Sequence, residues 1–247
     1  MAVERDHVLE IGRLVRRTVR AARHYAAAVE ELLAFGAALL ALRLGGDLAR
    51  RWRERRSPEL VAWSAGLVAY AVACAALAWG AAAGWDGRVF RLYYLCGGLL
   101  TAPLLGVGSL LLAGRRWAAP LGLVWAGLAA GVAVAEPLTR EVAGTGVPAA
   151  QDHLDLFPAR VLAIAGNSAG TLAVVGVALL TLRRRPVGNL LVLAGIAVGG
   201  IGSTLVGLGE AGTALFFAAA ALLLYAGFMS RPARARLTLR RSVRPTP

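Results

Sequence analysis

The chain has 247 residues, of which 58% are hydrophobic and 17% are charged. Soluble domains contain about 45–50% apolar and about 25% charged residues, so this composition excludes an ordinary soluble domain and favours an integral membrane protein. All 27 basic residues are arginines, and the lack of lysine excludes a retinal-type Schiff base and a Walker A phosphate loop.

The net charge of +13 has two explanations. Clustered arginines bind nucleic-acid phosphates, but arginines between apolar runs also set membrane topology and contact anionic lipid. Because the arginines of this chain lie between apolar runs, we expect membrane lipids as partners and no nucleic acid.

Residues 1–28 predict a basic amphipathic helix that lies on a membrane surface. Val8, Ile11, Val15 and Val19 recur at helical spacing, and arginines occupy the positions between them. The alternative is a solvated arm that docks on a partner. The pattern differs from a cleavable signal peptide, which has a short apolar core.

Seven apolar runs predict membrane spans, because about 20 apolar residues cross about 30 Å of hydrocarbon as a helix. The predicted spans are 27–46, 60–83, 91–113, 117–135, 159–182, 187–207 and 211–230. The first is the weakest, since charges flank its short apolar core, and without it the count is six. Ser57-Pro58-Glu59 marks a helix start. The predicted fold class is an all-α, polytopic helical bundle, with a transmembrane domain at 29–230 and a basic tail at 231–247.

The arginines predict the orientation of this bundle. Basic loops at 50–56, 115–116 and 183–185 share one side with the tail at 231–247. The positive-inside rule makes that side, and the C-terminus, cytoplasmic in a multi-pass protein of the cell membrane. With seven spans, the arginines of residues 1–28 lie outside, against the rule; with six spans they lie inside.

Aromatic residues near the predicted span ends indicate an interfacial belt. The members of this belt are Trp63, Trp79, Trp85, Trp117, Tyr93 and Tyr94. With Arg91, the two tyrosines predict an interfacial anchor at the outer end of the span Arg91–Leu112.

Small residues predict close packing of the helices. Gly98, Ala102 and Gly106 form one seam, and we expect the span Arg91–Leu112 to contact mainly protein through it. Pro103 should kink this helix, with neighbouring groups satisfying the carbonyl it frees. Further seams comprise Gly195, Gly199, Ser203 and Gly207, and Gly127 with Gly131. The alternative role for an outward-facing seam is homo-oligomerisation.

The long connection at 136–158 holds Glu136, Glu141, Asp152 and Asp155. Long loops without secondary structure of their own are usually functional or disordered. We expect this one to form an outward-facing cap.

Two motifs carry weak chemical signals. Gly166–Gly170 matches the nucleophile elbow of serine hydrolases, but that chemistry needs a strand-to-helix turn and a base, whereas this segment falls in a predicted membrane helix. Asp152, His153 and Asp155 include metal-ligand types, without a second His or Cys nearby. We therefore expect no catalytic residues, no metal and no cofactor, and a protein that is not an enzyme.

Cys74 and Cys96 lie in apolar runs of adjacent predicted spans. Such cysteines usually pack as small buried hydrophobes. The alternative is a redox pair in an exterior compartment.

Ionisable residues deep in a membrane mark ion pathways and proton relays, and the predicted spans have almost none. The available polar groups are neutral, and they either line a site for an uncharged ligand or join helices. The candidate ligand-binding residues are Tyr94, Asn167, Thr171, Ser203 and Glu210, the last a lone carboxylate in a glycine-rich turn.

Four short motifs suggest a family. They are Arg91-x-Tyr93-Tyr94-Leu95, Leu105-Gly106-x-Gly108-Ser109, Phe157-Pro158-x-Arg160 and Arg185-Pro186-x-Gly188-Asn189. Over about residues 58–230 the chain resembles a widespread group of uncharacterised polytopic membrane proteins of actinobacteria and related lineages. The resemblance implies about seven spans and no particular activity.

The leading functional hypothesis is a non-enzymatic membrane component. Such a structural, sensory or assembly subunit would contact lipid or a membrane-protein partner through its basic face. The alternative is a transporter or carrier for an uncharged or apolar small molecule or lipid. A mid-membrane pocket lined by Tyr94, Asn167, Thr171 or Ser203 favours the carrier, whereas tightly sealed helices favour the subunit.

Overall fold

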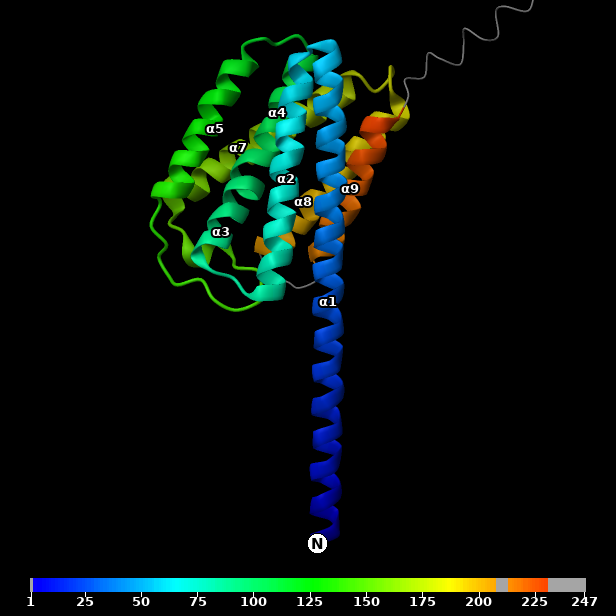
Figure 1. The fold of residues 1–247 in the computed structure, drawn as a ribbon, viewed down its shortest axis with the longest axis vertical. Coiled ribbons are helices and arrows are strands. Elements are labelled where there is room, and N and C mark those ends of the chain that lie inside the picture. The colour runs from blue at the N-terminus through cyan, green and yellow to red at the C-terminus, as the bar shows by residue number, and fades with distance from the viewer. Residues whose placement is uncertain (1, 208–212, 231–247) are drawn as a thin grey trace, which may run out of the picture.

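The computed structural model describes the backbone of residues 2–207 and 213–230, and the side chains of residues 28–29, 31–205 and 213–230. Within these residues every regular element is a helix, so the predicted all-α bundle is confirmed (Figure 1). The helices are α1 (Ala2–Arg55), α2 (Pro58–Ala83), α3 (Gly87–Tyr93), η1 (Tyr94–Leu100), α4 (Thr101–Leu112), α5 (Ala118–Ala135), α6 (Ala150–His153), η2 (Leu156–Arg160), α7 (Val161–Leu180), α8 (Pro186–Gly207) and α9 (Thr213–Met229).

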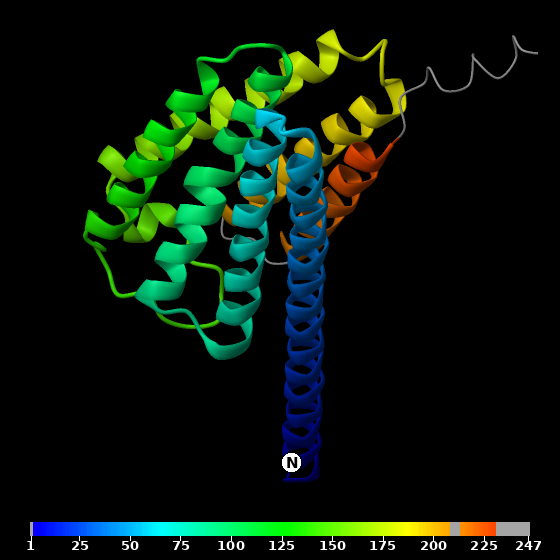
Figure 2. The same cartoon turned by 45° about the horizontal axis from the view of Figure 1, so that its top comes forward.

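The first helix is much longer than a membrane span. It has 54 residues, which corresponds to about 80 Å at 1.5 Å per residue. Its C-terminal half packs against α2 and α9, and its N-terminal half extends past the end of the bundle (Figures 1 and 2). The predicted surface helix at 1–28 and the predicted span at 27–46 are therefore one continuous helix, and the basic segment 50–56 is helical as far as Arg55 rather than a loop.

Six helical segments in the described residues are long and apolar enough to cross a membrane. They are Glu31–Arg55, Pro58–Ala83, Gly87–Leu112, Ala118–Ala135, Leu156–Leu180 and Pro186–Leu205. The weakest predicted span, 27–46, overlaps the first of these. The predicted span at 211–230 corresponds to α9, which is apolar but has only 17 described residues. As the sequence predicts, α2 begins with Pro58 at its first position.

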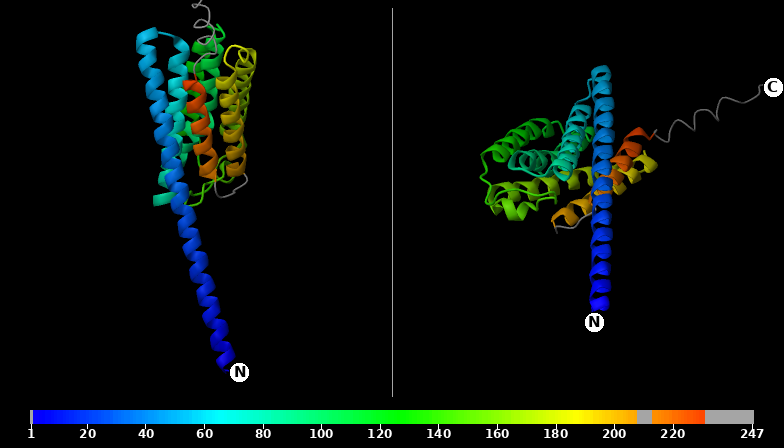
Figure 3. Two further views of the ribbon diagram at one scale, coloured as in Figure 1. Left: turned by 90° about the vertical axis from the view of Figure 1, so that its right-hand side faces the viewer. Right: turned by 60° about the horizontal axis from the view of Figure 1, so that its bottom comes forward.

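The connections at the two ends of the bundle differ in their arginine content. The turns after α1, α4 and α7 lie at one end, together with the C-terminal end of α9 (Figures 1 and 3). Arginines concentrate there: Arg50, Arg51, Arg53, Arg55, Arg56, Arg115, Arg116, Arg183, Arg184 and Arg185. The 136–158 connection and the α2–α3 turn lie at the opposite end, toward which the N-terminal half of α1 extends. The predicted tail at 231–247 lies outside the described residues.

Polar side chains cap the helix ends, where backbone carbonyls lack helical partners. Arg91 donates to the carbonyl of Ala133 at 2.7 Å, at the end of α5. Arg185 donates to the carbonyl of Ser230 at 2.7 Å, just beyond α9. Asn189 donates to the carbonyl of Ala178 at 3.0 Å, near the end of α7. These arginine and asparagine residues of the sequence motifs therefore have a structural role.

The third membrane segment, Gly87–Leu112, changes from α-helix to π-helix in its middle. Between α3 and α4 the chain forms the wider π-helix η1, in which the amide of Thr101 donates to the carbonyl of Cys96. Pro103 has no N–H for the carbonyl of Leu99, and the indole Nε1 of Trp125 donates to that oxygen at 2.8 Å. The expectation that a neighbouring group satisfies the carbonyl freed by Pro103 is confirmed.

This compensation predicts the behaviour of a double-mutant cycle. Trp125→Phe should lower the free energy of unfolding by about 1–3 kcal/mol, because the buried Leu99 carbonyl loses its donor. In a Pro103→Ala background the same change should cost less, since the new amide of residue 103 can bond that carbonyl. Thermal unfolding of the four proteins in one detergent measures the coupling. Equal losses in both backgrounds would contradict this account.

The seam of Gly98, Ala102 and Gly106 packs against α7, as predicted. A side chain at Gly106 would meet the backbone of Gly170, and one at Gly170 would meet the backbone of Ala102. Of the whole span Arg91–Leu112, only Leu92 and Leu112 are exposed. The seam therefore contacts protein, as predicted, while most other residues of the span are half-buried.

The other two seams have different surroundings. Gly195 and Gly199 approach α9, and added side chains there would contact Leu224 and Ala220. Gly127 and Gly131 of α5 have no atom within 4 Å of an added Cβ among the described residues. Internal packing therefore accounts for the α8 seam and not for the α5 seam.

Candidate functional site

A cavity of about 400 Å³ lies between the helices. Its walls are formed by the middle of α2, by η1 and the start of α4, and by the middle of α7, α8 and α9. It therefore adjoins the π-helical part of the third membrane segment. The lining residues include Leu67, Tyr70, Cys74, Leu77, Tyr93, Tyr94, Thr101, Asn167, Thr171, Ile196, Gly200, Ser203, Phe217 and Leu224.

Four of the candidate ligand-binding residues line this cavity. They are Tyr94 from η1, Asn167 and Thr171 from α7, and Ser203 from α8. Asn167 and Thr171 are one helical turn apart and so share a face of α7. The fifth candidate, Glu210, lies outside the described residues.

The aromatic anchor predicted at Arg91, Tyr93 and Tyr94 has a different role. Both tyrosines line the cavity, and Arg91 caps α5. Trp85, another predicted belt residue, is buried and stacks edge-on against Tyr93 with ring centroids 5.4 Å apart. The prediction that these aromatic residues lie at the membrane interface is wrong because proximity to a span end does not distinguish a lipid-facing side chain from an inward-facing one. Trp79 and Trp117 are exposed, as a belt requires.

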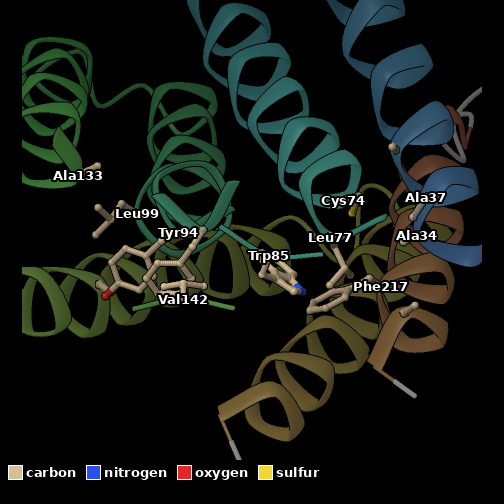
Figure 4. Packing of buried hydrophobic residues seen from close by; sticks show 14 of the residues in the cluster. Ala34, Ala37, Cys74, Leu77, Trp85, Tyr94, Leu99, Ala133, Val142 and Phe217 are labelled. Carbon is tan, nitrogen blue, oxygen red and sulfur yellow. The ribbon is translucent and has the colours of Figure 1, made fainter. Parts of the chain in front are cut away.

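The apolar wall of the site continues into a cluster of buried side chains. Leu77 of α2, Trp85 of the α2–α3 turn and Phe217 of α9 point toward one another in Figure 4. A side chain at Gly80 would overlap the Trp85 ring, so this glycine gives the ring its place against α2. The Tyr94 hydroxyl points away from Phe217 in the same view.

The connection at 136–158 closes one end of the cavity. Pro148, Ala150 and Gln151 contribute to its lining. Val142 and Leu154 anchor the connection, since both are buried in the main hydrophobic cluster, and the amide of Trp85 donates to the carbonyl of Gly144 at 2.7 Å. Sequence reasoning predicted a cap but not its lining residues, because a loop without periodicity indicates no inward face.

The polar groups of the cavity include two that sequence reasoning did not select as candidates. Tyr70 donates its hydroxyl proton to the carbonyl of Phe217 at 2.7 Å, which ties α2 to α9. Thr101 donates to the carbonyl of Cys96 at 2.7 Å, and Asn167 donates through Nδ2 to the carbonyl of Gly98 at 2.9 Å. The position of Thr101, two residues before Pro103, was the sequence feature that could have identified it.

The segment Gly166–Gly170 has no resemblance to a nucleophile elbow in space. It lies within α7, where Ser168 is exposed on the helix surface. Gly166 faces Trp125 and Pro103, and Gly170 faces the backbone of α4. Close helix packing accounts for these glycines.

The acidic cap does not gather a metal site within the described residues. No group of three His, Cys, Asp or Glu side chains is arranged to hold an ion there. His153 packs against Phe90 with ring centroids 5.5 Å apart, and its Nδ1 lies 3.4 Å from the carbonyl of Arg140.

The two cysteines differ in their access to the cavity. Both are buried and neither forms a disulfide, but the cavity lining includes Cys74 and not Cys96. We expect N-ethylmaleimide, a small uncharged thiol reagent, to label Cys74 in a Cys96→Ala variant faster than Cys96 in a Cys74→Ala variant. Intact-protein mass spectrometry of the two time courses measures this. Equal rates would contradict an open space beside Cys74.

No model of a known protein family, no curated protein and no solved structure matches this chain.

Proposed function

We propose that this protein binds, and carries within the membrane, an uncharged apolar small molecule or lipid. The supporting observation is the cavity of about 400 Å³, which is in the size range of small-molecule sites. Much of its lining comes from the middle of the membrane-length helices α2, α7 and α8.

The lining determines the class of ligand. Among the described residues, no Asp, Glu, Arg or His side chain lines the cavity. A charged ligand would lose its hydration there without an opposite charge to compensate, at a cost of several kcal/mol. The walls are instead apolar, with a few neutral hydroxyl and amide groups, as in sites that bind uncharged molecules.

The proposed topology has seven spans, with α9 as the seventh. The arginine-rich end is cytoplasmic by the positive-inside rule, where its guanidinium groups contact anionic lipid headgroups of the cell membrane. The C-terminus is then cytoplasmic, and the 136–158 cap and the N-terminal half of α1 are on the other side.

Co-purification tests the proposed function. The full chain is isolated from native membranes in mild detergent, and the organic extract and the protein fraction are both analysed by mass spectrometry. We expect one uncharged apolar molecule in near-stoichiometric amount, absent from a helical membrane protein of similar size purified in parallel. A stoichiometric protein partner with no bound molecule would instead support the subunit hypothesis and contradict this proposal.

A further inference from the structure

Three polar residues of the cavity lie where η1 and α4 cross α7. Gly170 lies against the backbone of Ala102, so the neighbouring residues Thr171 and Thr101 flank the same crossing. Asn167, one turn before Thr171, donates to the carbonyl of Gly98. We call Thr101, Asn167 and Thr171 the crossing patch, and all three line the cavity.

Several of the polar atoms around the cavity are already engaged as donors. The hydroxyl protons of Tyr70 and Thr101 go to the carbonyls of Phe217 and Cys96. A hydroxyl has one proton and two lone pairs, so these oxygens have only acceptor capacity left. The amide of Asn167 uses one of its two N–H groups on the carbonyl of Gly98 and keeps the other N–H as a donor and Oδ1 as an acceptor.

Four further hydroxyls remain uncommitted within the described part of the chain. They line the cavity and have no hydrogen-bond partner among the described residues: Tyr93, Tyr94, Thr171 and Ser203. Each can donate or accept. The lining therefore offers hydroxyl oxygens that can only accept a hydrogen bond, beside hydroxyl groups that can both donate and accept one.

Away from the crossing patch the walls are mainly hydrocarbon. Leu67 and Leu77 line the cavity from α2, Ile196 from α8, and Phe217 and Leu224 from α9. The site thus combines mainly apolar walls with a group of neighbouring polar residues at the crossing. Its complement is a molecule with a hydrocarbon body and a polar group at one place.

We propose that the ligand is an apolar alcohol, whose hydroxyl donates to an oxygen of the crossing patch and accepts from the hydroxyl of Thr171. This inference rests on the proposed function and narrows it. An ether, ester or ketone only accepts, and it would leave the hydroxyl oxygen of Thr101 and Oδ1 of Asn167 without a donor. A hydrocarbon would satisfy none of these groups, and unsatisfied polar groups in an apolar site weaken binding.

Farnesol and its methyl ether are matched probes, because both are uncharged and differ only at the hydroxyl. The Cys96→Ala protein in lipid nanodiscs is treated with N-ethylmaleimide at increasing mole fractions of each probe, and protection of Cys74 reports occupancy. A shift of the thermal midpoint is the second readout. We expect farnesol to act at about one tenth of the mole fraction that the ether requires, as for the loss of one hydrogen bond.

Variants locate the effect. Thr101→Val should remove the preference for the alcohol, whereas Thr101→Ser should keep it, because serine retains the hydroxyl. The amide of residue 101 still bonds the Cys96 carbonyl in both. Thr204→Val is the matched control, since this exposed threonine of α8 also donates to a backbone carbonyl of the preceding helical turn, that of Gly200, but lies outside the cavity lining.

The outcomes separate the two proposals. Equal action of farnesol and its ether, with both blocked by Gly200→Leu in the cavity wall, would overturn the alcohol inference and leave the proposed function in place. No effect of either probe on Cys74 labelling or on the thermal midpoint would overturn both. A preference for the alcohol that persists in Thr101→Val would also overturn the assignment of the crossing patch.

Discussion

Replacing Gly170 with alanine should lower the free energy of unfolding by about 3 kcal/mol, as severe overpacking does. The added Cβ would overlap the carbonyl of Ala102. A backbone group cannot rotate away as a flexible side chain can, so α4 and α7 would have to separate. Separation would also disturb the bond from Asn167 to Gly98. Unfolding in detergent, followed by circular dichroism, measures the loss.

Gly176→Ala is the matched control for this prediction. Gly176 lies on the same helix, and an added Cβ there meets no atom within 4 Å among the described residues. Alanine favours helix over glycine by up to about 1 kcal/mol, so this variant should be neutral or slightly stabilised. Similar losses in the two variants would contradict a backbone crossing at Gly170.

Replacing Gly200 with leucine should abolish most ligand binding. Gly200 lines the cavity and is exposed, and an added Cβ meets no atom within 4 Å among the described residues. The variant should therefore fold, with the larger side chain occupying space that a ligand needs. An overlap costing about 1–3 kcal/mol weakens binding by roughly tenfold to hundredfold.

Gly131→Leu provides the comparison, because it makes the same change at another helical glycine without a neighbour within 4 Å. This position is on α5 and does not line the cavity. The measurement is the amount of co-purified apolar molecule per protein in the two variants and the wild type. Retained ligand in Gly200→Leu, or equal loss in both variants, would argue against the cavity as the binding site.

Much of the architecture follows from local sequence. Apolar runs of about 20 residues indicate membrane-length helices wherever they occur, and the start of α2 at Pro58 follows from proline chemistry. The seam at Gly98, Ala102 and Gly106 and the carbonyl freed by Pro103 were also predictable, because each depends on residues within one segment. The continuity of residues 1–28 with the following span was not predictable, since an Arg-rich stretch and an apolar stretch can belong either to two helices or to one.

The candidate site could be predicted only in part from the sequence. Neutral polar residues in apolar helices are conspicuous, and Tyr94, Asn167, Thr171 and Ser203 were selected for that reason. Whether such residues join helices or line a space depends on the partner helix. Asn167 does both, since it bonds the Gly98 carbonyl and lines the cavity.

By itself, the sequence determined which segments are apolar helices and which end of the bundle is rich in arginine. Only the tertiary structure decided that Tyr93 and Tyr94 face inward, that Arg91 caps α5, and that residues of α2, η1, α7, α8 and α9 enclose one cavity. The physical reason is that hydrophobicity selects segments for the membrane but not the faces they present to one another. In lipid those faces are selected by shape and by hydrogen bonds between helices, as where Gly170 meets Ala102.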